Sequence, residues 1–180
     1  MTDEALKELV ASLAVESKKT DEQLKKTDEQ LEKLTRKVDR IGTLVGNIAN
    51  NQGDVAEEYF VNSLRHRLKI GEMEFDYLIP NYVIEGKKIR DEFDILLVNG
   101  ESVAIIEVKY KVHPSDVEKL AGKIANLKRL PQYRGYRVYA GVAGFHVSDA
   151  ARQRALERGY FVLQRRGKVV ETYTAGMQAA

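Results

Sequence analysis

Two neighbouring apolar segments of the chain carry charged side chains of the kinds that bind metal ions and phosphates. The segments are 91–98 (DEFDILLV) and 102–110 (SVAIIEVKY), and the Asn-Gly pair between them is a strong signal for the tight turn of a β-hairpin. Side chains alternate between the two faces of a strand, so Glu107 and Lys109 project from the same face. A carboxylate and an ammonium at the end of a core strand are costly unless each has a partner. A divalent cation and a polyanionic substrate would supply both partners.

Asp94, a short hairpin and the spacing Glu107-x-Lys109 resemble the core motif of the PD-(D/E)XK, or restriction-endonuclease-like, nuclease superfamily. The resemblance covers about residues 53–165, and Phe93 stands where the proline in the superfamily's name would precede Asp94. It implies that Asp94 and Glu107 bind Mg²⁺ and that Lys109 assists the attacking water. The other interpretation of these three residues is a salt-bridge cluster at a strand end, with no chemistry.

A helix is predicted to precede the strands, from Asp54 as its N-cap to about residue 68. In the resembled superfamily an acidic residue on this helix often completes the site. Glu57, four residues after Gly53, is at the position that this acid has in resolvase-like members. The helix dipole alone would also favour Glu57 and Glu58 in a first turn. The residues therefore leave Glu57 open between a metal ligand and a first-turn acid, and Glu58 is the alternative ligand.

Hydrolysis of a phosphodiester needs an acidified water, stabilised charge on the phosphoryl oxygens and a stabilised leaving alkoxide. One or two Mg²⁺ ions supply much of this, carboxylates are their natural ligands, and Mn²⁺ is expected to substitute. The resemblance places Asp94 and Glu107 around the metal, with the Val108 carbonyl as a further ligand. It gives Lys109 the task of orienting or deprotonating the water and of stabilising the pentavalent transition state.

Charge is distributed unevenly along the chain. Residues 51–118 contain fourteen acidic and eight basic side chains, whereas residues 119–168 contain twelve basic and two acidic ones. A basic segment of this kind can follow the phosphate backbone of DNA or RNA. Lys119, Lys123 and His113 are the candidate substrate-binding residues. The alternative is that the charges belong to ordinary solvated helix faces.

Residues 3–50 contain no proline and repeat with a seven-residue period, most visibly in the near-duplicate TDEQLKK-TDEQLEK of residues 20–33. The a positions of the heptads are Val10, Ser17, Leu24, Leu31, Val38 and Val45. The d positions are Leu6, Leu13, Thr20, Thr27, Leu34, Ile41 and Ile48. This pattern predicts a coiled-coil helix about 70 Å long. Such a helix cannot bury its stripe alone, so residues 1–50 are expected to form a homo-oligomer; the competing arrangement folds the helix back on its own domain.

The remaining residues, 51–180, are predicted to form one α/β (α+β) domain with a restriction-endonuclease-like core. A capping box at Ser115–Glu118 indicates a helix that reaches about residue 130. Ser148 caps a later helix that Gly159 ends. The order of elements is helix, three or four strands, helix, strand, helix, strand, which favours a mixed central sheet flanked by helices. Residues 50–53 are the expected junction with the coiled coil.

The chain contains no cysteine, which excludes disulfides and thiolate metal sites. It shows neither a signal peptide nor an apolar run long enough to span a membrane, so a cytoplasmic location is expected. The expected function is that of a Mg²⁺-dependent endonuclease acting on DNA, or on RNA, with no membrane partner. The alternative is a non-catalytic nucleic-acid-binding or protein-interaction module that keeps the nuclease-like fold and works through its coiled coil.

Overall fold

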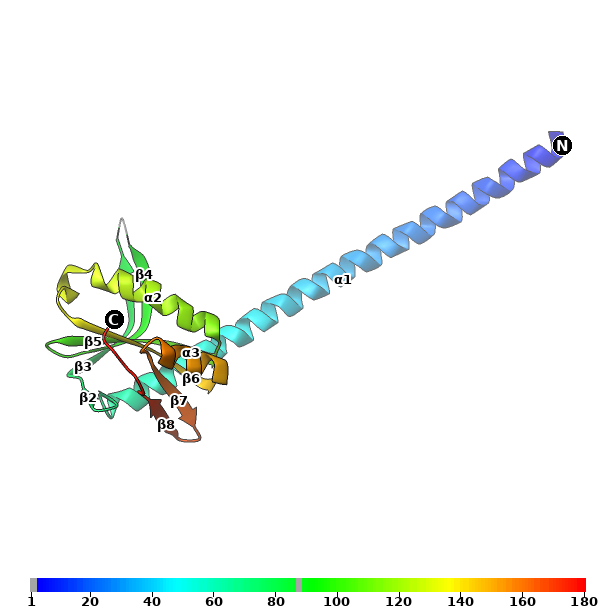
Figure 1. The fold of residues 1–180 in the computed structure, drawn as a ribbon. Helices are drawn as coiled ribbons and strands as arrows, with labels where there is room; N and C mark the ends of the chain where they lie inside the picture. The colour runs from blue at the N-terminus through cyan, green and yellow to red at the C-terminus, as the bar shows by residue number, and fades with distance from the viewer. Residues whose placement is uncertain (1–2, 87–88) are drawn as a thin grey trace. The chain divides into compact units, whose positions relative to one another are not determined.

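The computed structural model describes residues 3–86 and 89–180 (Figure 1). The chain separates into two compact units, residues 1–49 and 50–180. Helix α1 (Asp3–Arg65) contributes residues to both units. Among the described residues, no helix is long and apolar enough to cross a lipid bilayer.

Helix α1 is continuous over 63 residues, and this corrects one prediction. The sequence predicts a junction at 50–53 and a new helix capped by Asp54, but α1 passes through these residues without a break. A glycine within a helix costs only about 1 kcal/mol, which neighbouring turns can offset. The turns that follow Gly53 are held by Ala56 and Phe60, both fully buried.

The apolar heptad stripe of α1 is exposed in a single chain wherever its side chains are described, between residues 13 and 41. Six of its side chains have exposed fractions of 56–59 %: Leu13, Leu24, Leu31, Leu34, Val38 and Ile41. The hydroxyls of Thr20 and Thr27, at two d positions, donate to backbone carbonyls one turn earlier. The stripe positions Leu6, Val10, Val45 and Ile48 lie outside the described side chains. A lone helix therefore leaves in water a stripe whose burial would stabilise the protein.

Residues 50–180 contain a six-stranded mixed sheet in the order β3-β4-β5-β6-β7-β8. Its strands are β3 (Tyr77–Glu85), β4 (Arg90–Val98), β5 (Ser102–Val112), β6 (Arg137–Val147), β7 (Phe161–Arg166) and β8 (Val169–Tyr173). Strands β5, β6 and β7 are parallel, and the pairs β3–β4, β4–β5 and β7–β8 are antiparallel. A separate two-stranded sheet pairs β1 (Lys69–Ile70) with β2 (Met73–Glu74).

Two helices form the crossovers between the parallel strands, as such connections require. Helix α2 (Pro114–Lys128) joins β5 to β6 and is followed by a 3-10 turn (Pro131–Tyr133), and helix α3 (Asp149–Glu157) joins β6 to β7. The Ser148 hydroxyl accepts a hydrogen bond from the Ala151 N–H, so the predicted cap of α3 is confirmed. The prediction of a mixed sheet flanked by helices is also confirmed.

The predicted capping box of α2 is wrong by two residues. The helix begins at Pro114, and the Asp116 carboxylate accepts a hydrogen bond from the backbone N–H of His113. Asp116 therefore has the position in the capping box that was predicted for Glu118. Proline suits the first turn of a helix because its missing N–H would have no partner there, which explains the earlier start.

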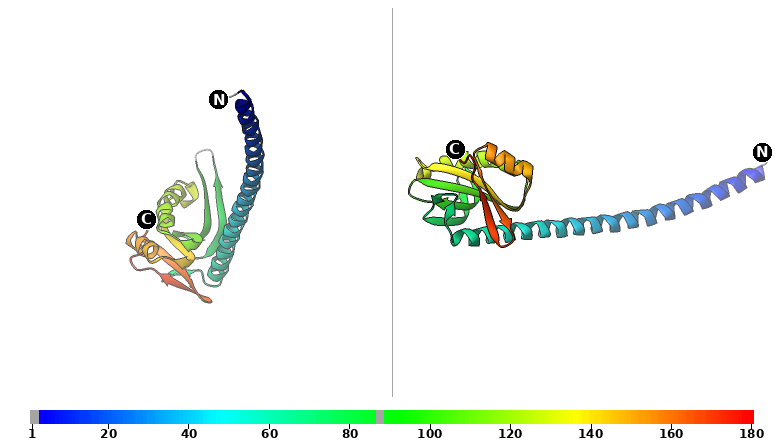
Figure 2. Two further views of the ribbon diagram at one scale, coloured as in Figure 1. Left: turned by 90° about the vertical axis from the view of Figure 1, so that its right-hand side faces the viewer. Right: turned by 60° about the horizontal axis from the view of Figure 1, so that its bottom comes forward.

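Two apolar cores fill the two sides of the sheet. Helices α2 and α3 cover one side, where Leu120 and Ala151 pack with strand residues such as Ile105 (Figure 1, Figure 2). The last turns of α1 cover the other side, where Phe60 packs with residues such as Ile106. The alternation of β5 between the two cores leaves Glu107 on the side of Ile105, beneath α2.

Candidate functional site

The site is built where strands β4 and β5 part. The two strands pair from Val98 down to Ile95, which lies opposite Ile106. One residue further, the Asp94 carboxylate accepts a hydrogen bond from the Val108 backbone N–H, with 2.7 Å between Oδ2 and N. A side chain thus replaces the carbonyl that an unbroken ladder would supply. The parted strands leave room for charged side chains between them.

Strand β3 is also irregular at this level. Asn81 falls opposite Asp94, because the β3–β4 ladder pairs the residues on either side of both. Asn81 has φ of 49°, in the left-handed region that asparagine tolerates better than most residues. The alternation of β4 shifts here as well: Phe93 and Ile95, two residues apart, lie in different cores. Irregular strand geometry of this kind re-aims side chains and often accompanies functional sites.

Four charged side chains meet in the gap. Asp94 and Glu107 are buried, with exposed fractions of 9 % and 5 %. The ammonium of Lys109 lies 2.7 Å from Glu107 Oε1 and 3.5 Å from Asp94 Oδ2, and it donates to the Val108 carbonyl. Lys123, from α2, places its Nζ 2.7 Å from Glu107 Oε2. The structure thus brings Asp94, Glu107 and Lys109 together and adds Lys123 to them.

The pKa values of Asp94 and Lys109 are both raised. Burial, followed by the charge of Glu107, raises the pKa of Asp94, against the attraction of Lys109 and the Val108 N–H. Burial would lower the pKa of Lys109, but the carboxylates of Asp94 and Glu107 outweigh it and raise that pKa. Lys109 is therefore an ammonium at neutral pH, suited to orienting groups and stabilising anions rather than to accepting a proton.

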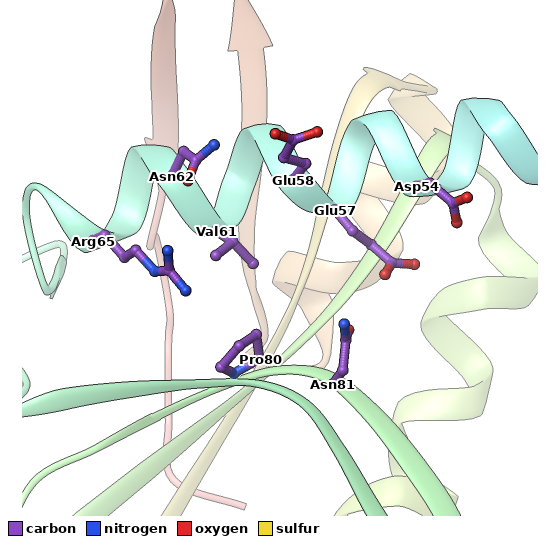
Figure 3. A pocket seen from close by; sticks show the side chains of 8 residues that line it. All are labelled: Asp54, Glu57, Glu58, Val61, Asn62, Arg65, Pro80 and Asn81. Carbon is purple, nitrogen blue, oxygen red and sulfur yellow. The ribbon is translucent and has the colours of Figure 1, made fainter.

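Glu57 lies beside this cluster on α1. Burial and then the charge of Asp94 raise the pKa of Glu57, which places the two carboxyl groups within electrostatic reach. Glu57 also lines a pocket of about 410 Å³ between α1 and β3, whose opposite wall includes Asn81. In Figure 3 the Glu57 carboxylate points toward the side of Asn81, whereas Glu58 points away from β3. The geometry favours Glu57 over Glu58 as the acid that faces Asp94.

The other predicted substrate-binding residues lie at the start of α2. Lys119 pairs with the buried carboxylate of Asp116 at 3.1 Å, and His113 is exposed and bonds to the same carboxylate through its backbone N–H. No described hydrogen bond or ion pair joins either residue to Asp94 or Glu107. Of the three candidates, only Lys123 contacts Glu107.

Part of the basic segment is neutralised within the protein. Glu118 pairs with Arg154 at 2.6 Å and also with Arg158, and Arg137 pairs with Glu101 at 2.6 Å. These arginines form solvent-exposed ion pairs, as expected if the charges belong to ordinary solvated faces of the protein. The count of basic residues therefore overstates the charge that is free to meet phosphates.

Asp94 and Glu107 are suitable ligands for a hard divalent cation. Glu107 Oε2 is buried and has no aligned hydrogen-bond donor, although the Lys123 ammonium is close to it. Such an oxygen can coordinate a cation that takes the place of the ammonium, and carboxylate oxygens are the ligands that Mg²⁺ prefers. Glu57 is a further acid within electrostatic reach of Asp94, but the described residues contain no ready-made group of three acidic or histidine side chains spaced to hold a metal. The Val108 carbonyl, the other predicted ligand, accepts from Lys109 at 2.8 Å.

Sequence reasoning missed Asn81 and the direct contact of Lys123 with Glu107. The left-handed conformation of Asn81 follows a proline, and Pro80-Asn81 gives only a general turn signal. Comparison with protein-family models, with curated proteins and with solved structures finds no match to this chain. The resemblance to the PD-(D/E)XK superfamily therefore rests on Asp94, Glu107 and Lys109 and on their arrangement at the parting strands.

Proposed function

We propose that the chain is a Mg²⁺-dependent nuclease that hydrolyses phosphodiester bonds in DNA, or in RNA, and that assembles through residues 1–50. One observation carries the proposal: two buried carboxylates, Asp94 and Glu107, share the ammonium of Lys109 where β4 and β5 part. A buried acid pair with a cation costs free energy that a purely structural role does not require. Groups of this kind with perturbed pKa values are typical of catalytic sites.

The fold gives further support for a restriction-endonuclease-like core. Helix α1 is followed by the antiparallel strands β3, β4 and β5, then by α2 and by β6, parallel to β5. The charged residues lie on the adjacent strands β4 and β5, and Glu57 lies on the preceding helix. This is the arrangement that the resemblance implies for a nuclease of the superfamily.

Each side chain has a distinct task in the proposed reaction. Asp94 and Glu107 hold the divalent cation, with Glu57 as the further acid; when bound, the cation polarises the phosphate and acidifies the attacking water. Lys109, an ammonium at neutral pH, is held by both carboxylates at the edge of the gap. From there it donates hydrogen bonds to a phosphoryl oxygen and stabilises the charge that develops on it. Deprotonation of the water is not a task for Lys109 in this state.

Cleavage assays with Mn²⁺ or Mg²⁺ test the proposed activity. Single-stranded, double-stranded and branched DNA should be compared with RNA, using the full chain, Asp94→Ala and Lys109→Ala. We expect cleavage of at least one of these substrates by the unmodified chain and its loss in both variants. Cleavage that survives in both variants would show that Asp94 and Lys109 do not form the catalytic site.

The ion pairs of Glu107 with Lys109 and Lys123 favour a second candidate function. In this second case the chain is a non-catalytic module that binds nucleic acid or protein. Lys109 and Lys123 each lie 2.7 Å from an oxygen of Glu107, so the acid is neutralised without a metal. In this case nucleic acid or protein would bind without cleavage, and Mn²⁺ would bind no more tightly to the unmodified chain than to Asp94→Ala. Direct metal binding therefore separates the two functions.

The exposed heptad stripe supports the proposed coiled coil. Leu31 and Leu34 lie at adjacent a and d positions and are more than half exposed. Replacing both with lysine places like charges in the seam, so we expect the mass of the particle in light scattering to fall to that of one chain. Lys33→Glu, between them and off the stripe, should leave the mass unchanged. A single-chain mass for the unmodified protein would reject the oligomer.

A further inference from the structure

Lys123 is the one basic side chain that crosses from α2 into the described site. Its side chain is 15 % exposed, and its Nζ lies 2.7 Å from Glu107 Oε2 and 4.0 Å from Asp91 Oδ1. The same ammonium donates to the Glu92 carbonyl and lies 5.4 Å from the centre of the Phe93 ring. Groups from β4 and β5 thus hold this ammonium over the gap between the two strands.

The ammonium of Lys123 stands where a cation bound to Glu107 would have to lie. The contact with Oε2 is short but not aligned as a hydrogen bond, so a metal can take the place of the ammonium without breaking a hydrogen bond. A divalent cation on that oxygen would repel an ammonium a few ångströms away, because the surroundings are largely shielded from water. Both cations can remain only if an anion, such as a phosphate, comes between them.

Lys123 is better placed to leave Glu107 than Lys109 is. Lys109 lies two residues from Glu107 on the same strand and is held by Asp94 and by the Val108 carbonyl as well. Lys123 reaches the site from a separate helix, and its ammonium already contacts Asp91 and the Glu92 carbonyl, which can hold it without Glu107. Its departure therefore requires only a rotation of its side chain.

We propose that Lys123 is a positioning residue that holds Glu107 in the resting protein, yields that carboxylate to the arriving divalent cation and then binds the phosphate of the substrate. This inference rests on the proposed nuclease function and deepens it. It makes metal and substrate cooperative: the metal binds weakly while the ammonium opposes it, and more tightly once a phosphate neutralises both charges. By linkage, the metal then strengthens substrate binding by the same factor.

The test measures Mn²⁺ binding directly, by electron paramagnetic resonance of the free ion, in the full chain without nucleic acid. Lys123→Met keeps the apolar stem and removes the charge, and we expect it to bind Mn²⁺ about tenfold more tightly than the unmodified chain, within the usual range of coupling between sites. Lys128→Met is the matched control, because Lys128 is a lysine near the end of the same helix and its ammonium donates to the Ala180 carbonyl. It should leave the affinity within about twofold, since its charge is farther from the metal.

A second arm measures the coupling to substrate. A short duplex with non-hydrolysable phosphorothioate linkages should tighten Mn²⁺ binding in the unmodified chain and in Lys128→Met, and much less in Lys123→Met. Lys123→Arg keeps the positive charge and should behave as the unmodified chain does, which separates charge from packing. Thermal unfolding of each variant without metal confirms that it is folded.

The outcomes distinguish this inference from the proposed function. If the unmodified chain binds Mn²⁺ and Asp94→Ala does not, but Lys123→Met binds it with unchanged or weaker affinity, the role of Lys123 is wrong and the metal site stands. If neither the unmodified chain nor Lys123→Met binds Mn²⁺, with or without the duplex, both proposals fail. If Lys123→Met binds Mn²⁺ more tightly and shows less coupling between metal and duplex, the result supports the proposal that Lys123 yields Glu107 to the metal and then binds the phosphate.

Discussion

Glu107 and Glu118 have the same kind of partners in two different settings. Glu107 contacts two lysines and has a side chain that is 7 % exposed, whereas Glu118 contacts two arginines and is 41 % exposed. Solvent-exposed pairs contribute little to stability, because water competes for both charges. A buried acid has lost that water, so its free energy depends on which cation faces it. Burial, rather than charge pairing, therefore distinguishes Glu107, where we propose that a metal replaces a lysine, from Glu118.

The largest expected difference between the two clusters is in catalysis. Lys109→Met should lower the single-turnover cleavage rate with Mn²⁺ by about 10²–10³-fold, as expected for the loss of a group that stabilises the transition state. Arg154→Met removes a cation from the exposed cluster and should leave the rate within about twofold, because its charge is screened by solvent. Equal losses in the two variants would mean that the basic surface, and not the buried pair, governs the activity.

A second difference lies in the backbone that supports each cluster. Asn81, opposite Asp94, has a left-handed conformation, whereas Glu118 lies within the regular helix α2. Asn81→Ala should lower the free energy of unfolding in urea by about 1 kcal/mol, and Asn81→Gly should not, because glycine adopts this conformation freely. If the two variants are equally stable, the strand at Asn81 is not strained in the way described. Retained cleavage in Asn81→Gly would limit Asn81 to a backbone role.

The smallest expected difference is in the dependence of stability on pH, and its sign is opposite in the two clusters. Burial and the charge of Glu107 raise the pKa of Asp94, whereas hydrogen bonds from Arg154 and the nearby charge of Arg158 lower the pKa of Glu118. With a raised pKa the folded state binds a proton that the unfolded chain releases, so stability increases as pH falls through the raised value. A carboxyl group with a lowered pKa stabilises the folded state at pH values above its ordinary pKa. This stabilisation is lost as pH falls through the lowered pKa.

Unfolding in urea at a series of pH values measures how the free energy of unfolding depends on pH in both clusters. At neutral pH, Asp94→Asn should be more stable than the unmodified chain, and the difference should shrink as pH falls through the raised pKa of Asp94. Glu118→Gln should be slightly less stable at neutral pH, and its difference should also shrink on acidification. A loss of stability in Asp94→Asn at neutral pH would show that the ion pair with Lys109 outweighs the cost of burial.

The sequence predicts the members of the buried cluster that depend on local structure. Asp94, Glu107 and Lys109 could be found because a tight turn and the two-residue alternation of strands operate within one hairpin. The contact of Lys123 with Glu107 depends on how α2 packs on the sheet, and no local pattern encodes that packing. Lys123 could be predicted as a candidate, but its contact with Glu107 could not, because tertiary structure makes that contact.

The same distinction applies to the fold. Strand and helix order followed from periodicity and caps, including the Ser148 cap of α3. The continuity of α1 through residues 50–53 did not, because weak helix formers there are offset by buried turns that follow. The shift of alternation at Asp94 also escaped prediction, since a regular period cannot show where it is interrupted.

Calorimetric titration of the full chain with Mn²⁺, beside Asp94→Asn and Glu118→Gln, tests the central claim most directly. If Asp94 and Glu107 form a metal site, the unmodified chain and Glu118→Gln should bind Mn²⁺ alike, and Asp94→Asn should bind it at least about tenfold more weakly, because a charged oxygen ligand is lost. Equal binding by all three proteins, or none by the unmodified chain, would contradict the claim that the parted strands hold a metal.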